Sequence, residues 1–161
     1  MSSRARKQMR LQLSFDAAQE YGKQHPDDFG GIYWDESPVM HGALLFTGQV
    51  EDHRRALRHL VPHPDRIEVR PCRYSQAQNM AWQDQIRQRI HGRWTSLSVT
   101  TFGPSRTDIG YVPHVWIWPW SEEKAEHIRQ ELAPIPVELG AQPGAVNPEL
   151  TPHPRPRPRP R

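Results

Sequence analysis

The chain has 161 residues, of which 35% are hydrophobic, and a formal net charge of +3 at pH 7. This length fits one domain, or two small halves that share a core. The single cysteine, Cys72, excludes an intrachain disulfide and a cysteine-based zinc site, and no apolar stretch approaches the roughly 20 residues that span a bilayer.

The N-terminal part of the chain predicts a frayed segment and then a helix. Residues 1–8 show no apolar periodicity, whereas residues 9–21 place apolar side chains at helical spacing. Gly22 and Pro26 predict the end of this helix. The basic residues near the start are not followed by the continuous apolar segment of a signal peptide, so we expect a cytoplasmic protein.

Two later segments share one order of elements, namely strand, strand, amphipathic helix and strand. The predicted elements are residues 31–36, 40–47, 51–61 and 66–70 in the first segment, and residues 95–102, 112–118, 121–132 and 136–139 in the second. The last three elements of each segment keep an offset of 70 residues, which relates Phe46 to Trp116 and Val69 to Leu139. The pattern predicts two tandem ββαβ units.

Local signals support these elements. The adjacent glycines Gly30 and Gly31 suit a bulge or a close backbone approach in the first strand. The continuous apolar run at residues 43–46 is typical of a central strand that is covered on both faces. Ser75 followed by Gln78 is a capping-box pattern, and it predicts the start of a helix that links the two units.

The predicted fold class is therefore α+β: two tandem ββαβ units, each a small three-stranded sheet backed by a helix, joined by a linking helix and followed by a disordered tail rich in Pro and Arg. The predicted parts are an N-terminal helix region at residues 1–28, a first unit at 29–74, the linking helix at 75–92, a second unit at 93–140 and the tail at 141–161. Such small sheets have unpaired edges, and an unpaired edge can accept a strand from a partner.

Charge is distributed unevenly along the chain. Residues 1–10 and 151–161 each carry four basic side chains and no acid, whereas residues 11–150 have a formal net charge of −5. Affinity for a polyanion, such as nucleic acid or the ribosome, should then lie in the ends. The arginines of the tail, spaced along an extended proline-rich segment, are Arg155, Arg157, Arg159 and Arg161. Alternatively, such a tail docks in an aromatic groove of a partner, or is low-complexity sequence without a role.

Three features together resemble a known family. They are the segment Phe29–Trp34 with a second strand that ends at Phe46-Thr47, the strand Arg66–Arg70 that runs into a helix capped by Ser75, and the repeat of the unit after that helix. In these features residues 10–140 are similar to the pro-region of alpha-lytic-protease-type bacterial serine proteases. The resemblance implies two small α/β halves that act as a folding chaperone and inhibitor, with an edge strand placed against the protease and the C-terminal tail in its active site.

The chain also departs from that family pattern. Its hairpin carries Asp108 where the family tends to have an Asn-containing turn, and neither a protease domain nor an export signal is recognised in the sequence. The alternate prolines of the tail lack the N–H donors that a β-type insertion into an active site needs. The resemblance implies no catalytic residue, because the pro-region has none.

Aromatic side chains are dense at residues 115–120. Strand alternation puts three tryptophans on one side of this segment, and Val115 and Ile117 on the other. On an exposed face the aromatic rings would form a platform for a peptide, a protein or stacked bases; otherwise they form the core between sheet and helices. The first unit has an aromatic pair that could likewise lie in the core or on a binding surface. The candidate partner-binding residues of both units are Trp116, Trp118, Trp120, Tyr33 and Trp34.

No pattern in the sequence predicts a reaction. Nine histidines invite a metal hypothesis, but no H-x-x-x-H pair with a nearby acid falls on a predicted helix. Cys72 is better explained as a small half-buried residue than as a nucleophile, and Asp35-Glu36 as part of a turn than as an acid–base pair. We therefore expect no enzymatic activity, no metal and no cofactor.

The sequence favours a non-enzymatic protein-binding module that engages a partner, such as a serine protease, through a sheet edge and the aromatic strand. The alternative is an accessory protein of nucleic acid or the ribosome, which its basic ends hold on the polyanion. We expect no association with a membrane.

Overall fold

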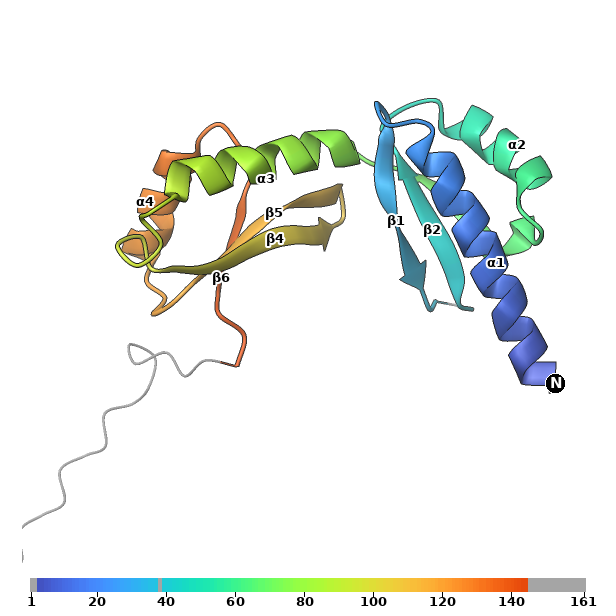
Figure 1. Ribbon diagram of the computed structural model, residues 1–161, viewed down its shortest axis with the longest axis horizontal. Coiled ribbons are helices and arrows are strands. Elements are labelled where there is room, and N and C mark those ends of the chain that lie inside the picture. The colour runs from blue at the N-terminus through green and yellow to red at the C-terminus, as the bar shows by residue number, and fades with distance from the viewer. Residues whose placement is uncertain (1–2, 38, 145–161) are drawn as a thin grey trace, which may run out of the picture. The chain divides into compact units, whose positions relative to one another are not determined.

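The structure is a computed structural model that describes residues 3–37 and 39–144 (Figure 1). The α-helices in this part of the chain are α1 (Ser3–Lys23), α2 (Val50–Leu60), α3 (Gln76–Ile90) and α4 (Glu122–Leu132), and η1 (Pro64–Arg66) is a short 3-10 helix. The strands are β1 (Phe29–Asp35), β2 (His41–Phe46), β3 (Ile67–Pro71), β4 (Val99–Thr107), β5 (Gly110–Ile117) and β6 (Glu138–Ala141). No helix among these is both long and apolar enough to cross a bilayer.

The chain forms two compact units. The first unit comprises the residues up to Gln83 together with Pro104–Val112, and the second comprises Asp84–Gly103 and the residues from Pro113 onward. The first unit contains a three-stranded sheet ordered β1-β2-β3. A second three-stranded sheet, ordered β4-β5-β6, belongs to the second unit except for residues 104–107 of β4 and 110–112 of β5, which are grouped with the first. Helices back both sheets. The predicted α+β class with duplicated sheet units is confirmed.

In the first unit, the core lies between the sheet and two helices. Strands β1 and β2 are antiparallel, and β3 lies parallel to β2, so that Leu44 pairs with Val69. These two side chains and Phe46 are buried against Leu57 of α2 and Ala18 of α1. Burial of this apolar area is the main term that stabilises the unit.

The adjacent glycines of β1 form the bulge and the close backbone approach that the sequence predicts. The register of β1 against β2 shifts between Phe29 and Gly31, and Gly31 has a φ of +123°, which disfavours side chains other than that of glycine. A Cβ at Gly30 would overlap the Cys72 sulfur. Both a bulge and a close approach are therefore present.

The second unit has the same topology around its own core. Strand β6 lies parallel to β5, and Val115 and Ile117 of β5 are fully buried, as are Ala125, Ile128 and Leu132 of α4. The side chain of Ser121, the predicted cap of α4, accepts a hydrogen bond from the Lys124 N–H at 3.3 Å.

Strand register shows that the single predicted offset of 70 residues is wrong for two of the three elements. Leu44 pairs with Val69 in the first unit, and Val115 pairs with Leu139 in the second. Strands β3 and β6 therefore keep the offset of 70, but β2 and β5 differ by 71, so that Phe46 corresponds to Ile117 and not to Trp116.

The difference lies in the strand pairing and not in the length of the connection. Three residues (47–49) precede α2 and six (61–66) follow it, whereas four (118–121) precede α4 and five (133–137) follow it, so the two connections are equally long. Because side chains alternate along a strand, a slip of one residue exchanges the two faces of a sheet. In the second unit the buried Ile117 therefore takes the place of Phe46, and Trp116 lies on the opposite face.

Two predicted boundaries are also wrong. Helix α1 begins at Ser3, so the described part of the segment 1–8 is helical and not frayed. The reason is that Arg, Lys, Gln and Met are good helix formers and no residue there interrupts the helix. Strand β4 begins at Val99 and not at Thr95, because Thr95–Ser98 form a turn in which the Leu97 N–H donates to the Arg93 carbonyl at 2.9 Å.

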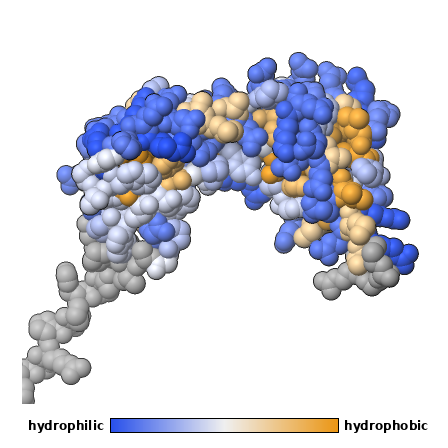
Figure 2. Space-filling view, viewed as in Figure 1, coloured by the Kyte–Doolittle hydropathy of each residue, from blue (hydrophilic) through white to orange (hydrophobic). Residues whose placement is uncertain are grey.

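Exposed apolar side chains are concentrated in the first unit. On the face shown in Figure 2, apolar residues gather over that unit, where hydrophilic residues separate them. The large hydrophobic residues that the described part of the chain exposes are Met9, Leu13, Trp34, Val39, Met40, Leu60, Met80 and Ile109, and all of them belong to the first unit.

Candidate binding surfaces

Trp116 of β5 lies on the face of the second sheet that points away from its core, and Trp118 follows the end of the strand. Trp116 and Trp118 are half-buried and alternate with Val115 and Ile117, which are 0% exposed. The Trp116 ring stacks on the His114 ring with a centroid separation of 4.2 Å. Trp116 thus lies opposite the core residues of β5, and the His114 ring covers part of it.

Strand β6 lies beside the stacked rings of His114 and Trp116. His114 Nδ1 lies 3.6 Å from a carboxylate oxygen of Glu138, and a Cβ at Gly140 would come within 2.8 Å of His114 Nε2. That Nε2 is buried and has no hydrogen-bond partner among the described residues. Glycine at this position is therefore what lets the imidazole lie close to the strand.

Strand β4 is an edge of the same sheet. The Trp118 N–H donates to the Ser98 carbonyl at 2.9 Å, and Thr100 Oγ1 lies 3.1 Å from the Trp116 carbonyl oxygen. Among the described residues β4 pairs with β5 alone, so its other side is an edge of the sheet. Thr100 and Thr101 are both exposed. The outer side of β4 therefore presents a free strand edge within the described residues.

The edges of the first sheet are partly occupied. The Arg54 guanidinium donates to the Val69 carbonyl of β3 at 2.9 Å. The Tyr111 hydroxyl lies 3.4 Å from the Ile32 carbonyl of β1. Side chains thus use backbone acceptors that an added strand would need, which makes β4 the more accessible edge.

The aromatic pair of the first unit is split between two faces. Trp34 is 36% exposed and stacks on Phe15 of α1 at 4.0 Å. Tyr33 lies on the opposite face, where the Arg106 guanidinium is 4.0 Å from its ring centroid and Arg70 donates to its hydroxyl at 2.6 Å. The five predicted aromatic residues therefore do not form one surface; Trp120, the fifth, is half-buried in the segment before α4.

Arg70 organises the polar face of the first sheet. It donates to Asp35 at 2.8 Å and to Glu68 at 2.7 Å, and His41 lies 2.9 Å from the same Glu68 oxygen. The Ser37 backbone N–H and Arg70 lower the pKa of Asp35, and Arg70 and His41 lower the pKa of Glu68. These charges satisfy one another, so the cluster fits a structural role.

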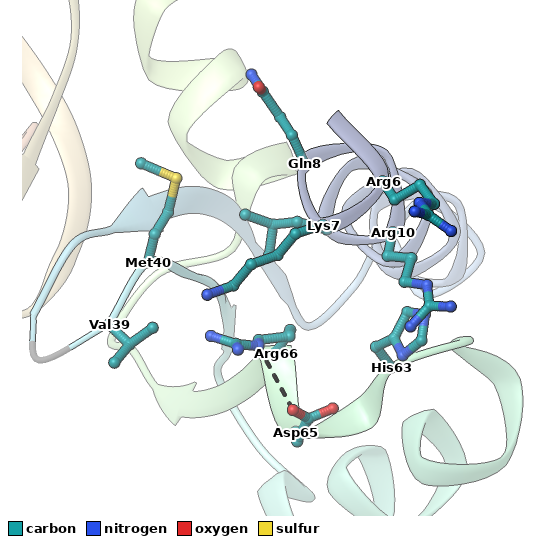
Figure 3. A pocket seen from close by; sticks show the side chains of 10 residues that line it. Arg6, Lys7, Gln8, Arg10, Val39, Met40, His63, Asp65 and Arg66 are labelled. Atoms are coloured by element: carbon teal, nitrogen blue, oxygen red, sulfur yellow. Dashed lines mark ion pairs between the residues drawn. The ribbon is translucent and has the colours of Figure 1, made fainter. Parts of the chain in front are cut away.

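A basic groove lies in the first unit, beside the N-terminal half of α1 (Figure 3). It has a volume of about 810 Å³. Lys7 and Arg66 point toward the same space in Figure 3, opposite Val39 and Met40. Its cationic lining residues and the two apolar residues across from Lys7 are Arg6, Lys7, Arg10, Arg66, Val39 and Met40. The sequence predicts the basic N-terminus but not that Arg66 and Met40 face it.

The structure also places the groups considered for catalysis. Cys72 is half-buried, and burial raises the pKa of its thiol to about 11, which keeps it protonated and poorly nucleophilic at neutral pH. No cluster of three His, Cys, Asp or Glu suited to a metal ion occurs among residues 3–37 and 39–144. The tail arginines from Arg155 to Arg161 lie outside the described residues.

Comparison with known proteins adds no assignment. No protein-family model matches the chain, and no curated protein is detectably similar to it.

Proposed function

We propose that the chain is a non-enzymatic protein-binding module, similar in kind to a protease pro-region, that accepts a partner strand on the outer edge of β4. The observation that carries this proposal is the edge strand β4, with the exposed Thr101, in the same small sheet as the half-buried Trp116. Strand addition uses backbone hydrogen bonds for affinity and side-chain contacts for specificity. Strands lie about 5 Å apart, so an added strand would run roughly 10 Å from β5, within reach of long side chains.

The proposal is tested by closing the edge. Thr101→Pro removes one backbone N–H donor from the edge strand β4, a substitution that edge strands tolerate. Immobilised full-length chain should capture a defined set of proteins that both Thr101→Pro and Trp118→Ala lose. Leu60→Ala, which truncates an exposed residue of the other unit, is the matched control and should retain them. Equal capture by all four proteins would refute the proposal.

A serine protease is the partner class that the family resemblance suggests. Adding the chain to an alpha-lytic-type protease should slow hydrolysis of a chromogenic peptide, and Thr101→Pro should inhibit less. Undiminished hydrolysis at a large molar excess of the chain would show that the protease is not a partner. The capture experiment tests separately whether a partner binds at the β4 edge.

One observation favours a second candidate, an accessory protein of nucleic acid or the ribosome. Arg6, Lys7 and Arg10 of α1 pair with no carboxylate among the described residues, so they remain available to phosphates. If the tail shares the binding with these cations, truncation after Leu150 should weaken RNA binding, and added salt should weaken RNA binding by the intact chain steeply. Equal RNA binding by the truncated and intact chains would exclude anchoring by the tail.

A further inference from the structure

We infer that the basic groove of the first unit is a second binding site, and that it takes an acidic amphipathic peptide segment of a partner protein. This inference concerns residues other than the β4 edge and the tryptophans of β5. It therefore stands or falls separately from strand addition at β4, whereas it assigns to a peptide the cations Arg6, Lys7 and Arg10 that the second candidate function would use for phosphates.

Charge is the first argument for an anionic occupant. Four cationic side chains line the groove, namely Arg6, Lys7, Arg10 and Arg66. The single carboxylate in the lining, Asp65, lies 3.4 Å from Arg66. Three of the four cations thus have no carboxylate partner in the part of the chain that the structure describes, and an anion in the groove would complement them.

The position of these cations in α1 is the second argument. The amino end of a helix carries a partial positive charge, which favours acidic side chains there and disfavours basic ones. Yet α1 has no acidic residue in its first turn, and its first acid is Asp16. The cations at the start of α1 therefore oppose the stability of the helix, and an anionic partner would relieve both this effect and their mutual repulsion.

The apolar lining distinguishes a peptide from a nucleic acid. Val39 is 51% exposed and Met40 is 44% exposed, and both lie across the groove from Lys7 (Figure 3). Methionine is a flexible side chain that adapts to varied apolar partners. Recognition of single-stranded nucleic acid uses aromatic side chains, chiefly Phe, Tyr and Trp, as stacking platforms, and the one aromatic ring among the residues that line this groove is the imidazole of His63. Aliphatic and cationic walls together fit a peptide in which acidic and aliphatic residues alternate.

The size of the groove agrees with this occupant. Its volume of about 810 Å³ is that of a site for a short segment rather than for a small ion. Its walls come from α1, from the residues before β2 and from the segment that contains η1. Three separate parts of one unit therefore build it, which gives the groove a defined shape.

The test measures fluorescence anisotropy of a labelled peptide of alternating Glu and Leu, about twelve residues long, mixed with the full chain. Two probes of equal length serve as comparisons: a peptide of alternating Glu and Ser, and a single-stranded oligo-dT. The groove variants are Lys7→Glu and Met40→Ser. Arg129→Glu, which makes the same change of charge in α4 of the second unit, is the matched control.

The Glu-Leu peptide should bind more tightly than either comparison probe. Lys7→Glu should weaken this binding about tenfold and Met40→Ser about fivefold, whereas Arg129→Glu should change it less than about twofold. The inference is overturned if the Glu-Leu peptide fails to bind, or if the Glu-Ser peptide or oligo-dT binds as tightly. It is equally overturned if Lys7→Glu and Arg129→Glu have the same effect, since attraction would then not be local to the groove.

Discussion

At the scale of single residues, two contacts in the first unit set tight limits on substitution. One is the approach of the β1 backbone to Cys72 at Gly30, and the other is the environment of a buried histidine. Neither residue belongs to a proposed binding surface. Both should therefore affect the free energy of unfolding without a specific effect on partner binding.

Gly30→Ala should destabilise the protein by about 1–3 kcal/mol, the usual cost of forcing extra volume into a packed site. The added Cβ would overlap the Cys72 sulfur, and it would also lie 3.1 Å from the Leu45 Cβ. Denaturant titration followed by circular dichroism measures the change. Gly48→Ala is the control, because a Cβ at Gly48 meets no atom within 4 Å. Equal stability of the two variants would show that the β1 backbone can move away.

His53 is the second such residue. It is 4% exposed, and its two ring nitrogens lie 2.8 Å from the Tyr21 hydroxyl and 2.7 Å from an Asp28 carboxylate oxygen. Its ring stacks on Phe46 at 3.8 Å. The residue thus joins α2 to α1 and to the loop before β1.

His53→Ala should cost about 2–4 kcal/mol, since it leaves a cavity and two partners without a hydrogen bond. The same denaturant titration measures this loss. His59→Ala removes an exposed imidazole from the same helix and should change stability by less than about 0.5 kcal/mol. A small effect of His53→Ala would mean that water or neighbouring side chains replace the lost contacts.

At the scale of elements, α3 begins with the reciprocal cap that the sequence predicts. The Ser75 N–H donates to Gln78 Oε1 at 3.0 Å, and the Gln78 N–H donates to Ser75 Oγ at 3.2 Å. Ser75 is only 2% exposed, so water cannot readily replace its hydroxyl.

Ser75→Ala should therefore destabilise the protein by about 1 kcal/mol, the typical cost of losing a cap. Thermal unfolding followed at a helix signal measures the effect. Ser37→Ala, in an exposed turn, keeps the backbone N–H that bonds Asp35 and should unfold at the temperature of the unsubstituted chain. If both variants unfold at that temperature, the cap contributes nothing to stability.

At the scale of the whole molecule, the Arg70 cluster links stability to pH. The pKa values of Asp35 and Glu68 are lowered in the folded state, chiefly by the Ser37 N–H and by Arg70 respectively. The folded state thus favours the charged carboxylates more than the unfolded state does. Their contribution is fully present above the ordinary pKa of about 4 and is lost as the pH falls through the lower folded values.

The free energy of unfolding should therefore decline as the pH falls below about 4, and Arg70→Met should flatten part of this decline. Urea titrations at a series of pH values measure it. Arg58→Met is the control, because Arg58 is exposed and has no ion pair among the described residues. Parallel pH profiles for the original chain and Arg70→Met would show that the cluster does not couple to folding.

Local sequence patterns anticipate the elements of the fold well, because their causes are local. The capping box at Ser75, the bulge glycines of β1 and the apolar run of β2 each involve residues close in sequence. The errors fall where a boundary depends on competition between equally allowed structures. Helix α1 extends back to Ser3, and β4 begins four residues later than the predicted strand.

The candidate surfaces could be predicted only in part. Strand alternation correctly places Trp116 and Trp118 on the side opposite Val115 and Ile117, but alternation alone does not say which side the helices cover. The sequence likewise shows basic residues near the start of the chain without showing that Arg66, Val39 and Met40 lie across from them. Both questions depend on contacts between residues far apart in the chain.

By itself, the sequence determined the α+β class, the duplicated order of elements and the concentration of basic charge at the two ends, because periodicity, capping and composition are properties of neighbouring residues. Only the tertiary structure decided which face of β5 is buried, which edge strand is free and which side chains line the basic groove. The physical reason is that parallel pairing joins strands across a long connection, and a shift of one residue between the β2–β3 and β5–β6 pairings puts Ile117 at the core position that corresponds to Phe46 and Trp116 on the opposite face.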